Sequence, residues 1–157
     1  MSRAEAVLIA ALELLGLNAQ SARFVTLVET PARGVSANAV AYVIPPSDTI
    51  YLVMSSPVFV RALRADQNSP YQGSAPYRLL ASVLAHEFCH TRNRCDEQTA
   101  YEQQLTTLTL LGCDAGCADY QLIKQSMLSV LKAPKHRRLR AEESRSRLQE
   151  HSPSSTR

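Results

Sequence analysis

The chain has 157 residues, of which 45% are apolar and 20% charged, values typical of one globular domain that can bury a core. No apolar run approaches the roughly 18 residues of a transmembrane helix, which excludes a helical membrane protein. The formal net charge of +3 is uneven: residues 1–132 hold 10 basic and 11 acidic side chains, and residues 133–157 hold seven basic and three acidic. We expect a domain over residues 1–132 and a basic, disordered tail over residues 133–157.

The N-terminal stretch AEAVLIAALELLGL predicts an amphipathic helix over residues 3–16. It has some features of the apolar segment of a signal peptide, but Glu5 and Glu13 interrupt it and no clear cleavage site follows. We therefore expect a cytoplasmic protein. The residues predicted to face the core are Ala4, Leu8, Ala11, Leu12 and Leu15.

Strand patterns follow this helix. RFVTLVE (23–29) predicts a strand, and VAYVI (40–44) and TIYLV (49–53) predict a β-hairpin about a PPSD turn. A short helix is expected at 57–65, before the polar loop QNSPYQGSAP (67–76).

Three helices are predicted in the second half of the chain. Apolar residues at three- and four-residue spacing indicate a helix over 77–93, and the same periodicity indicates helices over 96–111 and 116–132. Gly112 and Pro134 end the last two. A helix, then strands, then helices is the order of an α+β domain with segregated layers.

Residues 86–90 read HEFCH. On a helix His86 and His90 lie one turn apart, about 40° apart around the axis, so both imidazoles can reach one ion about 2 Å away. Glu87 is poorly placed as a ligand but well placed to take a proton from water at a metal. The motif predicts metal-assisted hydrolysis, and the alternative is two ordinary polar histidines beside an apolar stripe.

A catalytic zinc site needs a third protein ligand, and Glu97 and Glu102 compete for that role. At about 100° per residue, Glu97 shares a helical face with the apolar residues that follow, whereas Glu102 points away with threonines. A carboxylate on an apolar face is costly unless a cation meets it. Ala100 lets the two helices approach, and the short TRNRCD connection makes them antiparallel neighbours. We expect Glu97 to be the ligand.

The HEFCH motif and the downstream ExxA run (EQTA, 97–100) resemble the gluzincin zinc metallopeptidases, especially their small single-domain forms, the minigluzincins. The resemblance covers about residues 37–112. It implies one zinc ion per chain, held by the two motif histidines and Glu97, with Glu87 as general base. It also implies a minimal zincin-like fold, in which a small twisted sheet lies over an active-site helix and a glutamate-bearing helix.

Other residues could complete such a site. Tyr101, one turn beyond Glu97, is a candidate oxyanion donor, and a packed core tyrosine is the alternative. Arg92 and Arg94 in the inter-helix turn could bind substrate carbonyls or a terminal carboxylate, although such arginines are often simply exposed. One hairpin strand could be a sheet edge that pairs with an extended peptide or protein substrate. We expect no membrane partner.

The four cysteines allow two local bridges, Cys89–Cys95 and Cys113–Cys117. A bridge between Cys95 and Cys113 is excluded, because a continuous helix would hold them roughly 27 Å apart. In a cytoplasmic protein we expect all four to be reduced thiols.

The sequence thus predicts a zinc-dependent metallopeptidase that hydrolyses peptide bonds with metal-activated water and Glu87 as base. The main alternative is a catalytically inactive zincin-fold binding or regulatory module with structural zinc. A nucleic-acid binder that uses the basic tail rests on charge alone, and the tail lacks aromatic residues for base stacking.

Overall fold

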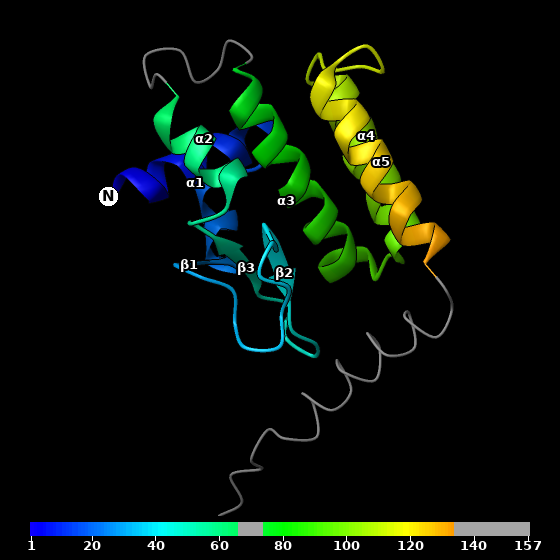
Figure 1. Ribbon diagram of the computed structural model, residues 1–157. Coiled ribbons are helices and arrows are strands. Elements are labelled where there is room, and N and C mark those ends of the chain that lie inside the picture. Colours follow the sequence, from blue (N-terminus) through cyan, green and yellow to red (C-terminus); the bar gives the residue numbers. More distant parts are fainter. Residues whose placement is uncertain (66–73, 134–157) are drawn as a thin grey trace, which may run out of the picture.

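The computed structural model describes residues 1–65 and 74–133. The predicted tail from residue 134 onward, and most of the predicted polar loop, lie outside these ranges. The described residues form an α+β fold (Figure 1) with the elements α1 (Arg3–Leu14), η1 (Ala19–Phe24, a 3-10 helix), β1 (Val25–Val28), β2 (Ala41–Val43), β3 (Ile50–Val53), α2 (Pro57–Arg64), α3 (Ala75–Asn93), α4 (Glu97–Leu110) and α5 (Ala118–Lys132). Among these described helices, none is both long enough and apolar enough to cross a lipid bilayer.

The sheet has the strand order β1-β3-β2, so β3 is central and β1 and β2 are its edges. β2 and β3 pair antiparallel, with Tyr42 opposite Tyr51, which confirms the predicted hairpin. β1 pairs with β3 in parallel, with Val25 opposite Ile50. This parallel pairing was not predicted, because it joins segments that are distant in sequence and no local pattern marks it.

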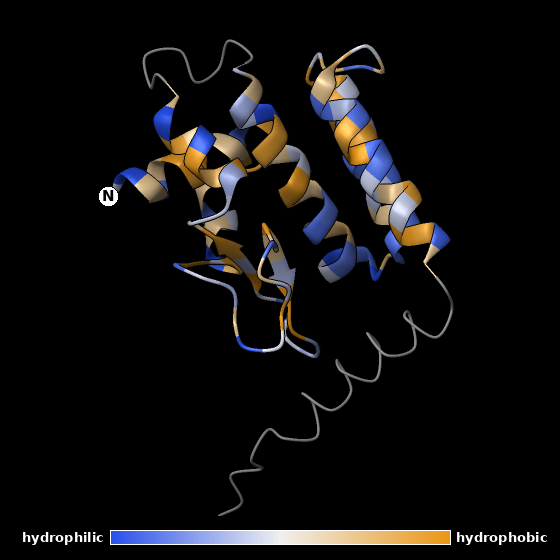
Figure 2. Cartoon of the chain, viewed as in Figure 1, coloured by the Kyte–Doolittle hydropathy of each residue, from blue (hydrophilic) through white to orange (hydrophobic). Residues whose placement is uncertain are grey.

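Helix α3 is the centre of the fold. α1 and α2 pack against it on one side and α4 on the other, while α5 packs against α4 (Figure 1). β2 and β3 also contact α3. A single apolar cluster joins α1, the sheet, α2 and α3, and its completely buried side chains include those of Leu12, Ile50, Phe59, Leu80 and Leu84. The C-terminal end of α3 is hydrophilic by contrast (Figure 2), and one of its polar residues, His86, is buried.

Side-chain caps mark the starts of α1, α2 and α4. Ser2 and Glu5 form a capping box at the start of α1. At α4, the side chain of Asp96 accepts the backbone N–H of Thr99 at 2.8 Å. Glu97 is therefore the first helical residue of α4, and this start sets the direction in which its side chain points.

The predicted strand at 23–29 and the predicted helices are confirmed to within two residues at each end. Helix η1 was not predicted, because a 3-10 helix of six residues is too short to show a hydrophobic period. The division between a domain and a tail at residue 132 stays a prediction, since the tail lies outside the described residues.

All four cysteines form disulfides. Cys89 pairs with Cys95 and Cys113 with Cys117, with Cα–Cα distances of 5.4 and 5.3 Å. These are the two bridges that the spacing allowed, but the expectation of reduced thiols is wrong for this structure. The physical reason is local, because each pair spans the turn at the end of a helix, where the chain returns within bridging distance.

Candidate metal centre

His86 and His90 lie one turn apart near the C-terminal end of α3. Their Nε2 atoms are 3.1 Å apart, and their rings meet edge to face with centroids 4.9 Å apart. His86 is buried and His90 is half-buried. The Nδ1 atom of His90 lies 2.8 Å from the carbonyl oxygen of Cys95, to which it can donate a hydrogen bond. The two Nε2 atoms are therefore the ones that face a shared space.

Glu97 brings its carboxylate to the same space from α4. Its Oε1 atom lies 3.2 Å from His90 Nε2, and its Oε2 atom lies 3.6 Å from His86 Nε2. Ala100, one turn later, is completely buried, as expected if a small residue lets α4 approach α3. Glu102 is exposed and accepts a hydrogen bond from Gln98 at 3.0 Å. Of the two competing glutamates, Glu97 faces the histidines and Glu102 does not.

The group of His86, His90 and Glu97 could hold one metal ion. Each residue offers one ligand atom, and all of these atoms lie within 4.8 Å of one another. Ligands placed tetrahedrally about 2.1 Å from an ion are about 3.4 Å apart. The two Nε2 atoms lie 3.1 Å apart, and each has one oxygen of the Glu97 carboxylate at a similar distance, Oε1 at 3.2 Å from His90 and Oε2 at 3.6 Å from His86. The donor atoms therefore fit a small divalent cation with three protein ligands.

The charges of this group depend on one another. Hydrogen bonds from His86 and His90 hold the pKa of the Glu97 carboxyl far below its usual range, although burial opposes them. The hydrogen bond to Glu97 raises the pKa of His90 against the effect of burial, and the Cys95 carbonyl adds to the rise. The carboxylate is thus ionised at neutral pH and favours a positive partner. A divalent cation and the proton on His90 compete for the position beside the Glu97 carboxylate.

Glu87 follows His86 on α3 and is half-buried. Its negative charge contributes to the raised pKa of both His90 and Tyr101. Glu87 is adjacent in sequence to the ligand His86 and is not a member of the ligand group.

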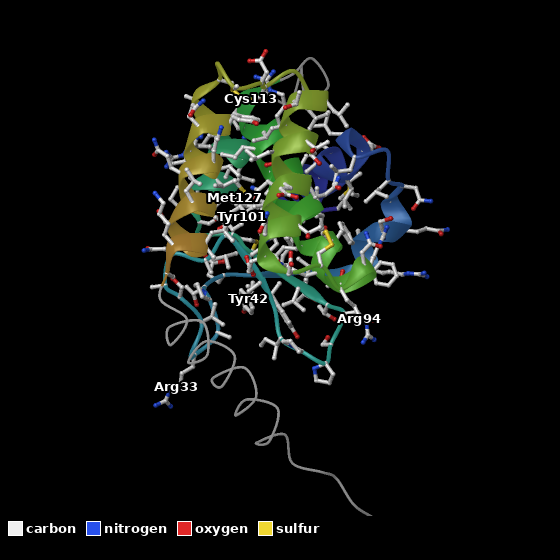
Figure 3. All side chains as sticks on the ribbon, turned by 90° about the vertical axis from the view of Figure 1, so that its right-hand side faces the viewer. Arg33, Tyr42, Arg94, Tyr101, Cys113 and Met127 are labelled. Carbon is white, nitrogen blue, oxygen red and sulfur yellow. A yellow bond between two sulfur atoms is a disulfide. The ribbon has the colours of Figure 1, made fainter. Side chains whose placement is uncertain are left out.

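Tyr101 lies one turn beyond Glu97 on α4. Its ring stands edge-on to the ring of His86, with centroids 4.7 Å apart and an interplanar angle of 80°. Burial, followed by the negative charges of Glu97 and Glu87, raises the pKa of Tyr101. The hydroxyl therefore keeps its proton at neutral pH and can donate it to a hydrogen bond. Figure 3 views this face of the molecule, with Tyr101 near its middle.

The two arginines considered as substrate contacts have other environments. The guanidinium carbon of Arg92 lies 4.4 Å from the ring centroid of Phe88 and 5.7 Å from that of Phe24, so Arg92 links η1 to α3 by cation–π contacts. Arg94 is exposed and ends α3 with a φ of 51°. In Figure 3 it is labelled at a lower corner, away from Tyr101.

One member of the site was missed at the sequence level. The backbone carbonyl of Cys95 is the hydrogen-bond partner of His90. A backbone group leaves no mark in the residue pattern, although the feasible Cys89–Cys95 bridge already indicated a closed turn at this place.

No protein-family model matches the chain, and no curated protein or solved structure is significantly similar to it. A fold alone would not identify an activity, because one fold can carry many functions. The chemistry of the residues around His86 and Glu97 is what bears on function.

Proposed function

We propose that this protein is a zinc-dependent metallopeptidase of the gluzincin type that hydrolyses peptide bonds. The observation that supports the proposal most directly is the convergence of His86, His90 and Glu97, each of which offers one ligand atom within 4.8 Å of the others. Glu87, which follows the ligand His86 in sequence and is not one of the three ligands, would supply the base. Metal-assisted hydrolysis needs both components.

Zinc suits this ligand set better than other common cations. Mg²⁺ and Ca²⁺ prefer oxygen ligands, whereas two imidazoles and one carboxylate are a frequent set in catalytic zinc sites. Three protein ligands leave one position open, while structural zinc sites are closed by four ligands, often cysteines. All four cysteines of this chain are held in disulfides. This favours a catalytic ion over structural zinc.

Each residue then has one task in the proposed mechanism. His86, His90 and Glu97 hold the ion. Zinc, when bound, polarises the scissile carbonyl and lowers the pKa of the attacking water. Glu87 takes the proton of that water and delivers it to the leaving amine. Tyr101 donates a hydrogen bond to the carbonyl oxygen as negative charge develops on it.

The arrangement of elements is compatible with the zincin-like plan that the motifs imply. The helix with the two histidines contacts both the sheet and the helix that bears Glu97. β2 is an edge strand, runs antiparallel to β3 and contacts α3. A peptide or protein segment that pairs with β2 as an extended strand would pass beside α3. We propose this edge as the docking site of the substrate.

A peptide library tests the activity. Zinc-loaded wild-type protein is incubated with proteome-derived peptides, and the products are identified by mass spectrometry. We expect cleavage that a chelator abolishes. Glu87→Gln keeps the size of the side chain but removes the base, so it should lower the rate by about 10²- to 10⁴-fold or more without loss of zinc.

The matched control is Glu102→Gln, the same substitution at an exposed position on α4, which should cleave at the wild-type rate. Wild-type cleavage rates in Glu87→Gln would show that the hydrolytic mechanism is wrong. Zinc-loaded wild-type protein that cleaves no peptide would instead support the non-catalytic zincin-fold module.

A further inference from the structure

The Cys89–Cys95 disulfide lies at the metal centre. Cys89 directly precedes His90 on α3, and Cys95 lies two residues before Glu97 at the start of α4. The bridge therefore closes the turn between the two helices that supply the metal ligands. It covalently links the segment that carries one ligand to the segment that carries another.

Two hydrogen bonds reinforce this link. The backbone N–H of Cys95 donates to the carbonyl of Cys89 at 3.2 Å, and the carbonyl of Cys95 accepts from His90 Nδ1 at 2.8 Å. Between Cys89 and Cys95 the chain passes through Arg94, whose φ of 51° is in the left-handed region. That conformation is unfavourable for a residue with a side chain, so the turn needs a restraint that holds it. The disulfide is such a restraint.

The Cys95 carbonyl favours a proton on Nδ1 of His90. A carbonyl can only accept, so a His90 ring whose Nε2 lone pair binds an ion keeps its proton on Nδ1, facing this carbonyl. His86 is fixed differently, because its ring is buried and lies edge-on to Tyr101. Its own Nδ1 has no hydrogen-bond partner among the described residues. Of the two histidines, only His90 depends on the turn for its orientation.

We propose that the Cys89–Cys95 disulfide is a positioning element of the metal centre, which holds the Cys95 carbonyl against His90 and so fixes the tautomer and direction of this ligand. The inference rests on the proposed metal site. Loss of the hydrogen-bond partner of a metal-ligating histidine typically weakens metal binding by about 10- to 100-fold. The redox state of this turn therefore controls how tightly the protein holds zinc.

Two double variants of the full chain test this role. Cys89→Ala/Cys95→Ala removes the bridge at the metal centre. Cys113→Ala/Cys117→Ala is the matched control, because it removes a bridge of similar length between α4 and α5 and also truncates a buried cysteine. Zinc dissociation constants are measured by competition with a chromophoric chelator. We expect about 10- to 100-fold weaker binding in the first variant and unchanged binding in the control.

The tautomer of His90 gives a second readout that needs no metal. Long-range proton–nitrogen NMR spectra are recorded on zinc-free protein at alkaline pH, where the imidazole is neutral. The Glu97 carboxylate faces Nε2 in both proteins, so we expect a larger Nδ1–H fraction in the wild type than in Cys89→Ala/Cys95→Ala.

Chemical reduction provides the same comparison without a substitution at the site. Folded Cys113→Ala/Cys117→Ala protein, which has only the Cys89–Cys95 bridge to lose, is treated with a water-soluble phosphine. The disulfide gains two electrons and two protons and becomes two thiols, while the phosphine takes the oxygen of one water molecule and becomes a phosphine oxide. The reduced protein should lose zinc affinity as the Cys89→Ala/Cys95→Ala variant does.

Three results would overturn the inference. The first is equal zinc affinity with and without the Cys89–Cys95 bridge, and the second is the same Nδ1–H fraction of His90 with and without it. The third is an equal loss of affinity in the two double variants, since this would reflect the stability of the fold alone. If the wild type binds no zinc at all, the proposed metal centre is wrong, and the NMR spectra still decide whether the disulfide orients His90.

Discussion

Glu97 and Glu102 show how one helix can place two identical side chains in unlike surroundings. The Glu97 carboxylate lies 3.2 and 3.6 Å from two imidazole nitrogens, whereas Glu102 is exposed and bonded to Gln98. About 140° around the helix axis separates them. The direction of each depends on where α4 begins, and the cap at Asp96 fixes that point.

Alanine substitution should therefore affect zinc binding strongly at Glu97 and hardly at all at Glu102. Glu97→Ala removes a ligand and should weaken zinc binding strongly, as measured by isothermal titration calorimetry. Glu102→Ala should leave the zinc dissociation constant unchanged and alter the free energy of unfolding by no more than about 0.5 kcal/mol. Small and equal effects would point to a two-histidine site completed by some other group, and the reverse pattern would refute the assignment of Glu97.

Tyr101 is a candidate for contact with the reacting carbonyl. Tyr101→Phe keeps the ring against His86 and removes only the hydroxyl, so the zinc dissociation constant should stay the same. If the hydroxyl stabilises the oxyanion, kcat on a peptide found in the library should fall by about 10²- to 10³-fold. A wild-type kcat in Tyr101→Phe would make Tyr101 an ordinary packing residue between α3 and α4.

Among the elements, the pairing of α3 with α4 positions the site. Gln104 donates to Ser82 across the two helices at 3.4 Å, and Leu108 is completely buried. The sequence predicted both helices and their antiparallel approach, because apolar periodicity and a short connection are local signals. It also predicted that Glu97 lies on the same face of its helix as the buried apolar residues that follow it. These signals were sufficient to bring His86, His90 and Glu97 together.

Other features depend on contacts that no local pattern records. The parallel pairing of β1 with β3 joins distant segments, and the left-handed turn at Arg94 and the Cys95 carbonyl are properties of the backbone. Spacing showed that the Cys89–Cys95 bridge was possible, but the expected compartment favoured free thiols. The metal ligands could therefore be predicted, whereas the groups that orient His90 could not.

Two leucines on α4 test the energetics of this helix pair. Leu108 is completely buried and Leu110 is 81% exposed. Leu108→Ala leaves a cavity between packed helices and should lower the free energy of unfolding by about 2–5 kcal/mol in denaturant titrations of zinc-free protein. Leu110→Ala should change it by less than about 0.5 kcal/mol. Similar losses in both variants would contradict the described packing of α4.

The whole molecule combines two parts of opposite net charge. Residues 1–132 carry 10 basic and 11 acidic side chains, which gives −1, and residues 133–157 carry seven basic and three acidic, which gives +4. The apolar cluster that unites the fold draws on α1, the sheet, α2 and α3, with Leu111 at the end of α4 packed against it.

Truncation after Ala133 should leave both the fold and the metal centre intact. The removed residues, 134–157, are rich in arginine and serine and poor in apolar side chains, a composition that buries little surface. We expect the truncated and full-length chains to have the same thermal unfolding temperature and the same zinc dissociation constant, measured side by side in one buffer. A large loss of either would show that the basic segment stabilises the domain. Salt-dependent binding of nucleic acid by the full-length chain alone would assign that segment a separate role, because phosphate contacts made by arginine weaken steeply as salt rises.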